Sequence, residues 1–174
     1  MIKEATGLIS PSIENIPAWL SVRPQWIVWK VEARGDDLAK VPHAVETGTR
    51  VDATDLLGWS SFEDAVEAYR SSCGFYSGIG FCLASCDPFV GIDLDGCRDP
   101  ESGEIAPWAK KILEGVQEAY VEISPSGEGA HIIVEGTVRA GGRSKRKVHL
   151  NGEVVGEIEM YSRDRFFTIT GVLL

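Results

Sequence analysis

The sequence contains no long hydrophobic run, since no apolar stretch approaches the roughly 20 residues that a helix needs to cross a bilayer. Its first residues, MIKEATGLIS, also lack the apolar core of a signal peptide. Both absences argue against a membrane-spanning or secreted chain. We therefore expect a cytoplasmic protein that has no membrane partner.

Cysteine is scarce as well, because the 174 residues include only Cys73, Cys82, Cys86 and Cys97. Free thiols are normal in a reducing compartment. Three residues separate Cys82 from Cys86, a spacing that occurs in zinc sites, but no compact second pair accompanies them. We expect no zinc site and treat the cysteines as small buried hydrophobic residues.

Positive charge is in deficit, with 17 Lys and Arg residues against 26 Asp and Glu residues and a net charge of -9. This balance argues against indiscriminate binding of nucleic acid. Segment 137–151 is the exception, because it carries Arg139, Arg143, Lys145, Arg146 and Lys147 and no acidic residue. The segment is either a local surface for anions or the solvated tip of a hairpin, and charge alone leaves both interpretations open.

The length of 174 residues, with 44% hydrophobic and 25% charged residues, fits one globular domain. A helix is predicted over 60–70, with a capping box at Ser60 and Glu63, and another from Pro107. Apolar and β-branched patterns predict strands at 26–31, 38–43, 78–83, 89–95, 119–124, 130–136, 156–161 and 165–172. Because no regular βαβ period appears, we expect an α+β fold of mixed β-sheets flanked by helices. The apolar ending TGVLL leads us to expect a domain of a longer protein.

The stretch GIDLDGC places Asp93 and Asp95 between apolar neighbours. On a strand these two carboxylates share one face, while Ile92 and Leu94 share the other. Neighbouring carboxylates repel each other unless a cation neutralises them. The pair indicates a metal site, or else it merely ends a strand before a turn at Gly96. A calcium loop is the weaker interpretation, because DLDGCRDPE departs from the EF-hand spacing.

Two later segments carry further candidate residues. SPSGEGAHIIV combines a flexible turn, whose backbone N–H groups suit an anion, with His131 at the start of a strand. In GEIEMY, Glu157 and Glu159 share one strand face, as the two aspartates do. Taken alone, the histidine is more simply a structural or surface residue, and the glutamates are the solvated face of an amphipathic strand.

The order of the three segments closely resembles the primase-polymerase domains of the archaeo-eukaryotic primase superfamily, especially those of phage and plasmid replication proteins. The motifs of that superfamily are an acidic pair on a strand, a histidine on a neighbouring strand and a further acid after an apolar residue. GIDLDGC, SPSGEGAHII and EIEMYSRDRFFTITG match them in that order. WIVWKV, KVP, GWSSFEDAVEAY and GIGFCL also resemble the front half of such domains, so the resemblance covers about residue 17 to the end. One departure is Gly129, where the superfamily often has a small hydroxyl residue two before the histidine.

This resemblance implies one primase-polymerase catalytic domain over 1–174, with an archaeo-eukaryotic primase-like core, that performs template-dependent nucleotidyl transfer. It implies two Mg²⁺ or Mn²⁺ ions held by Asp93, Asp95 and Glu159, since these ions demand hard oxygen ligands. Glu157 is the alternative third ligand, because it shares the face of Glu159. The residues expected to grip the triphosphate are His131, Ser126, Gly127 and Gly129, with Lys40 and Arg165 as further candidates.

The basic segment 137–151 would then follow template or primer phosphates, with an affinity that falls steeply with salt. The expected partners are a DNA template and primer, nucleoside triphosphates and a C-terminal helicase domain outside this chain. The resemblance places such a protein in a bacterial or archaeal host, encoded by a phage or plasmid, with this domain at its N-terminal part. Two other functions stay open: a catalytically silent nucleic-acid-binding domain of a replication initiator, and a metal-dependent nuclease that uses the same carboxylates.

Overall fold

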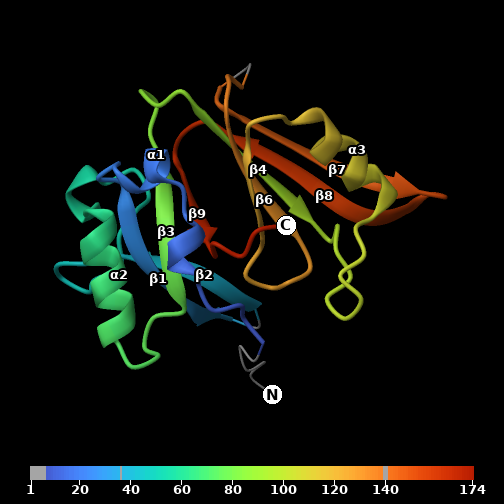
Figure 1. Cartoon of the computed structure of the whole chain (residues 1–174). Coiled ribbons are helices and arrows are strands. Elements are labelled where there is room, and N and C mark those ends of the chain that lie inside the picture. The colour runs from blue at the N-terminus through green and yellow to red at the C-terminus, as the bar shows by residue number, and fades with distance from the viewer. Residues whose placement is uncertain (1–6, 36, 139–140) are drawn as a thin grey trace.

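Two antiparallel sheets make up the core of the computed structural model, which describes residues 7–35, 37–138 and 141–174 (Figure 1). The first sheet has the order β2-β1-β3-β9 and the second has the order β5-β6-β4-β8-β7. The strands of the first sheet are β1 (Trp26–Arg34), β2 (Asp37–His43), β3 (Gly78–Leu83) and β9 (Arg165–Ile169). Those of the second are β4 (Phe89–Asp95), β5 (Tyr120–Ile123), β6 (Ala130–Glu135), β7 (Arg143–Leu150) and β8 (Glu153–Tyr161).

Helix α2 (Phe62–Ser71) packs against one face of the first sheet (Figure 1). Its buried Ala65 and Val66 belong to the same apolar cluster as Trp26 and Phe81 of the sheet. Shorter helical segments accompany this half of the molecule: α1 (Ala18–Ser21) and two 3₁₀ turns at Ile13–Asn15 and Leu56–Gly58. The same apolar cluster includes Phe89, Tyr120 and Ile133 of the second sheet, so it joins the two sheets.

The start of α2 corrects the predicted capping box by one residue. The N-cap is Ser61, whose Oγ accepts a hydrogen bond from the N–H of Asp64 at 3.1 Å. Ser60 cannot cap the helix because its backbone forms a bridge with Trp26, in which each residue donates its N–H to the carbonyl of the other. The first Ser of the pair therefore ends the preceding loop, and the second begins the helix.

Helix α3 (Pro107–Gly115) covers one face of the second sheet and begins at the predicted proline. Ile92 and Leu94 of β4 belong to one apolar cluster with Ala109 and Trp108 of this helix. Because side chains alternate along a strand, the aspartates between them point to the opposite face. That face is turned toward the first sheet, where the ring of Phe167 on β9 contacts the ring of His131 on β6.

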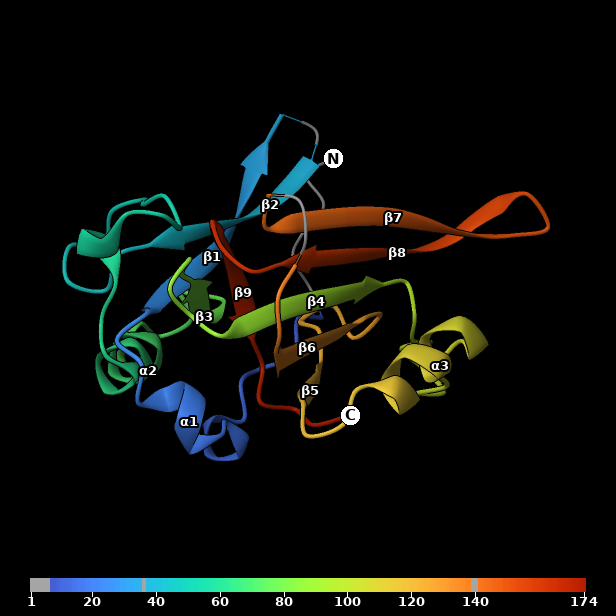
Figure 2. The ribbon, with the colours of Figure 1, turned by 90° about the horizontal axis from the view of Figure 1, so that it is seen from above.

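The predicted α+β class is confirmed, and eight of the strands lie at the predicted segments with shifts at their ends. Strand β7 was not predicted as a strand. It pairs with β8 along its length and forms an edge of the second sheet. In Figure 2 the β7–β8 hairpin extends well beyond the neighbouring strands. The basic segment is therefore neither a loop nor only a hairpin tip, because most of it is an exposed edge strand.

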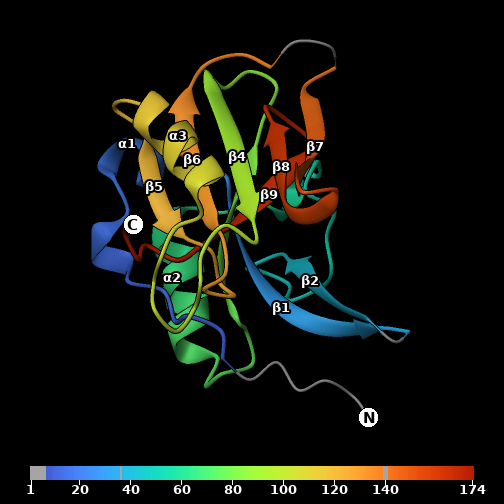
Figure 3. The same cartoon turned by 90° about the vertical axis from the view of Figure 1, so that its right-hand side faces the viewer.

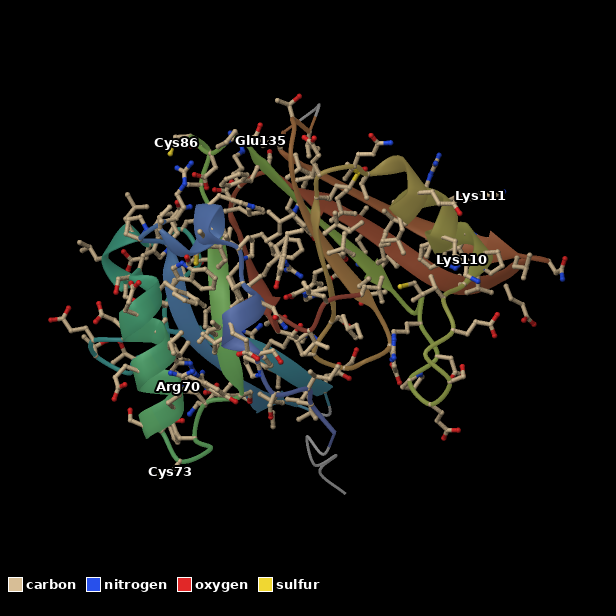
Figure 4. All side chains as sticks on the ribbon, in the orientation of Figure 1. Arg70, Cys73, Cys86, Lys110, Lys111 and Glu135 are labelled. Carbon is tan, nitrogen blue, oxygen red and sulfur yellow. The ribbon has the colours of Figure 1, made fainter. Side chains whose placement is uncertain are left out.

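The expectation that the cysteines are buried is correct for Cys82 and Cys97 and wrong for Cys73 and Cys86. The two exposed thiols lie in turns, one after α2 and the other between β3 and β4 (Figure 4). Side chains in such turns project from the surface rather than into the sheet. No helix within the described residues is long and apolar enough to cross a membrane.

The segment after β9 links the two sheets. It leaves the first sheet and runs beside β5 of the second, where the N–H of Ile123 donates to the carbonyl of Val172 at 2.8 Å. The Oγ1 of Thr170 donates to the carbonyl of Ile123 at 2.7 Å. Figure 3 shows the C-terminus beside β5. This course brings the backbone of residues 170–171 within hydrogen-bond distance of Glu122 on β5.

Candidate active site

One charged residue from each strand of the second sheet lies in a single row across that sheet. Cross-strand register places Glu122 of β5 opposite His131 of β6, and His131 opposite Asp93 of β4. Asp93 is in turn opposite Glu159 of β8, which is opposite Lys145 of β7. Paired residues of neighbouring strands point to the same face, so all five side chains lie on the side turned toward the first sheet.

A second row, two residues further along β4, contains Asp95, Glu157 and Lys147. The two rows together gather four carboxylates on one face of β4 and β8. One oxygen each from Asp95, Glu157 and Glu159 lies within 4.8 Å of the other two. The structure thus brings both candidates for the third ligand within 4.8 Å of Asp95.

These rows form one wall of a cavity of about 430 Å³. The first sheet supplies the opposite wall, which includes Lys40 from β2 and Arg165 from β9. Desolvation in the cavity lowers the pKa of the Lys40 ammonium, while the carboxylates of Asp93 and Asp95 partly offset this effect. Two cations that are remote in sequence therefore face the acidic rows, as the family resemblance implied.

The carboxylates of the cluster differ in their electrostatic environment. Burial alone would raise the pKa of Glu159, but hydrogen bonds from Lys145 and from the Tyr161 hydroxyl outweigh it and hold that pKa below its ordinary value. Desolvation raises the pKa of Asp95, and the charges of Asp93 and Glu159 raise it further. The cluster is therefore partly neutralised on its β7 side and carries uncompensated negative charge at Asp95.

Two buried oxygens in this cluster indicate that the residues fit a divalent metal. Oδ1 of Asp93 and Oε1 of Glu157 are buried and have no hydrogen-bond partner within the described part of the chain. A buried carboxylate oxygen without a donor is costly, and a cation can satisfy it. Oxygen-only donors are also the set that Mg²⁺ and Mn²⁺ prefer.

The His131 ring is hydrogen-bonded to Glu122, a residue that the sequence did not single out. Its Nδ1 lies 3.0 Å from Oε1 of the fully buried Glu122, and its Nε2 lies 3.7 Å from Oδ1 of Asp93. In the sequence, Glu122 reads as the polar member of an alternating strand, AYVEIS. Its cross-strand partners come from the β6 register and from residues 170–171, so no local pattern signals its role.

The predicted phosphate-binding turn does not line this cavity. Ser126, Gly127 and Gly129 are not among the residues that line it. The N–H of Gly127 donates to the Ser124 carbonyl, and the N–H of Gly129 donates to the Ser124 hydroxyl. Binding of a nucleotide by this turn stays a prediction. His131, Lys40 and Arg165, in contrast, line the same cavity as the carboxylates.

The basic residues of β7 divide between the two faces of the sheet. Arg143, Lys145 and Lys147 pair with Tyr161, Glu159 and Glu157, and so lie on the carboxylate face. Arg146 pairs with Ile158 and lies on the face that α3 covers elsewhere in the sheet. Arg139, the fifth predicted residue, lies outside the described residues.

No family model matches the chain. A DNA primase-polymerase of Nitratiruptor phage NrS-1 is 36% identical to it over 161 residues, which are 91% of this chain and 21% of that protein. The chain is homologous to that primase-polymerase. This similarity confirms the resemblance to primase-polymerases that the three motifs predicted.

The chain spans about a fifth of the length of this phage relative. The helicase domain that the resemblance implied stays a prediction.

Proposed function

We propose that residues 1–174 form one catalytic domain that joins a nucleoside triphosphate to the 3′-hydroxyl of a primer paired with a DNA template. The observation that carries the proposal is the four-carboxylate face of β4 and β8, opposed by Lys40 and Arg165 across one cavity. A protein that only bound DNA would gain nothing from carboxylates facing the phosphates. Homology to a DNA primase-polymerase supports the same class of reaction.

In this proposal Asp93, Asp95 and Glu159 hold two divalent ions, Mg²⁺ or Mn²⁺, and Glu157 is positioned to supply a further oxygen. Such ions, when bound, neutralise the charge that grows on the transferred phosphoryl group and activate the attacking hydroxyl. The chain's own contribution is the fixed spacing of these oxygens, because neighbouring backbone hydrogen bonds of β4 and β8 set it before a ligand arrives.

The triphosphate is proposed to lie between the two walls of the cavity. Nε2 of His131 faces it from the second sheet, while Lys40 and Arg165 face it from the first. These cationic or hydrogen-bonding groups stabilise negative charge that increases during transfer. Arg165 lies 3.7 Å from Glu159 and over the Tyr161 ring, so its guanidinium is already oriented toward the cavity.

Primer extension tests this proposal. A labelled primer annealed to a longer template should lengthen when the domain receives deoxynucleoside triphosphates with Mg²⁺ or Mn²⁺. The Asp93→Ala/Asp95→Ala double variant should give no detectable primer extension, because it removes two of the four carboxylates on this face. Asp99→Ala is the matched control, since Asp99 is exposed and only accepts hydrogen bonds from its own loop.

Each alternative function gives a different result in this assay. A primer that shortens without added triphosphates would indicate the nuclease. DNA binding without any extension by the parent, or extension that persists in the double variant, would contradict the proposed transferase.

A further inference from the structure

Glu122 is a fully buried carboxylate that accepts hydrogen bonds at both oxygens. Its Oε2 accepts from the Tyr120 hydroxyl at 2.6 Å, from the N–H of Thr170 at 2.9 Å and from the N–H of Gly171 at 2.8 Å. Its Oε1 lies 3.0 Å from Nδ1 of His131. The side chain therefore connects β5, the segment after β9 and the histidine of the polar row.

The hydrogen-bond donors to Oε2 determine whether Oε1 of Glu122 is an acceptor. The two backbone N–H groups can only donate, so Oε2 must be an acceptor. Three donors that converge on one oxygen suit a carboxylate, and this leaves Oε1 as a second acceptor. With Glu122 as a carboxylate, Nδ1 of His131 is the donor, and its N–H is hydrogen-bonded to Oε1 of Glu122.

We propose that Glu122 is a positioning residue for His131, which fixes the imidazole ring and its Nδ1 proton so that Nε2 faces the cavity. This inference rests on the proposed function, because it deepens the role assigned to His131 there. The edge-to-face contact between the His131 and Phe167 rings, with centroids 5.5 Å apart, restricts the same ring from the first sheet. The segment after β9 supplies two of the donors on Glu122, and so it holds the histidine indirectly.

Glu122→Gln distinguishes positioning from simple filling of space. The glutamine has nearly the same shape, but only one of its two terminal atoms is an acceptor. Three donors require that acceptor at the Oε2 position, so the amide NH₂ must face His131. Nδ1 of His131 would then become an acceptor and lose its proton, and the only ring proton would lie on Nε2.

Long-range ¹H–¹⁵N correlation spectra of the whole chain read this change directly. The chain has three histidines, and His131 is assigned by the loss of its signals in His131→Gln. We expect a protonated Nδ1 in the parent and an unprotonated Nδ1 in Glu122→Gln. An unprotonated Nδ1 in the parent would overturn the proposal even if the variant did not fold, and so would a protonated Nδ1 in a folded variant.

Primer extension gives the second readout. Glu122→Gln should raise KM for the incoming nucleotide about tenfold, with a smaller change in kcat, because the ring loses its Nδ1 proton and the carboxylate behind it, and its contact with the triphosphate weakens. Tyr120→Phe is the matched control: it removes a donor from Oε2 without contacting His131, so Nδ1 and KM should stay as in the parent while thermal stability falls.

The two proposals fail in distinguishable ways. An unchanged KM and kcat in Glu122→Gln, despite a switched Nδ1, would reduce Glu122 to a structural residue and overturn this inference. A parent that does not extend primers would contradict the proposed function, whereas the protonation of Nδ1 would still decide whether Glu122 positions the ring.

Discussion

Asp95 and Glu159 belong to the same carboxylate cluster, yet folding shifts their pKa values in opposite directions. Asp95 has no cation at hydrogen-bond distance within the described residues, so burial and its acidic neighbours raise its pKa. Glu159 is buried, whereas Asp95 is exposed, but Lys145 and Tyr161 donate hydrogen bonds to Glu159 and lower its pKa. At neutral pH and without a metal, ionised Asp95 destabilises the fold while ionised Glu159 stabilises it.

Neutral substitutions of these two residues should therefore act with opposite signs in the presence of a chelator. Asp95→Asn should raise the Tm only slightly at about pH 8, because the ionised carboxylate is removed but Asp95 is exposed and solvent screens its charge. The gain should disappear as pH falls through the raised pKa toward the ordinary value of about 4, where the parent becomes protonated. Glu159→Gln should lower the Tm at about pH 8, and that loss should shrink only below the ordinary pKa of a glutamate, as pH falls through the lowered pKa of Glu159. Thermal unfolding between about pH 8 and pH 3 measures both, and two shifts of the same sign at about pH 8 would contradict the assignment.

At the scale of single residues, the sequence was most informative where a pattern repeated. Asp93 with Asp95 and Glu157 with Glu159 alternate with aliphatic residues, so their shared faces could be predicted. Glu122 could not be predicted, because its partners at residues 170–171 lie 48 or more positions away. A polar residue in an alternating strand looks the same whether it faces water or a buried histidine.

Among the elements, β7 shows what hydrophobic periodicity misses. Strand β4 was predicted because Ile92 and Leu94 mark its buried face, whereas β7 is almost wholly exposed and has no such face. Its pairing comes from β8 alone, and it lies at the edge of the sheet. Lysine and arginine on an edge strand also discourage pairing with another chain's edge. Register on β8, which the sequence does not reveal, decides which basic residues face the cavity.

Two arginines of β7 offer a matched pair for testing that face. Arg143→Ala should weaken binding of a primer–template duplex and reduce the slope of log affinity against log salt by about 0.9, the loss of one phosphate contact. Arg146→Ala removes the same charge from the opposite face and should leave both quantities nearly unchanged. Fluorescence anisotropy over a range of salt concentrations measures affinity and slope together. Equal effects of the two substitutions would show that β7 attracts DNA by net charge and has no preferred face.

For the whole molecule, the site depends on how closely the two sheets approach each other. Acids and His131 come from the second sheet, and Lys40 and Arg165 come from the first, so neither sheet contains the site alone. The sequence predicted the strands of both sheets except β7, together with their motifs. It could not predict their approach, because the close contact depends on a glycine, Gly91 of β4, opposite the aromatic ring of Phe167 on β9.

A methyl group at Gly91 should therefore push the sheets apart. Its Cβ would lie 2.6 Å from Cζ of Phe167, too close for any carbon–carbon contact. Gly91→Ala should lower the Tm by about 5 °C, the usual cost of overpacking in a domain of this size. It should also slow primer extension, because Arg165 lies two residues from Phe167 on the same strand and would move away from Glu159.

A second substitution at the contact decides whether the clash is the cause. Gly91→Ala combined with Phe167→Leu should be more stable than the sum of the single changes predicts, because the smaller side chain leaves room for the methyl group. Gly115→Ala at the end of α3 is the control, since a Cβ there meets no atom within 4 Å. Additive losses in Tm across the double-mutant cycle would mean that Gly91 is required for some property of β4 itself. If the double variant instead loses less Tm than the sum of the single changes, and primer extension recovers with it, the spacing between the two sheets is what the active site requires.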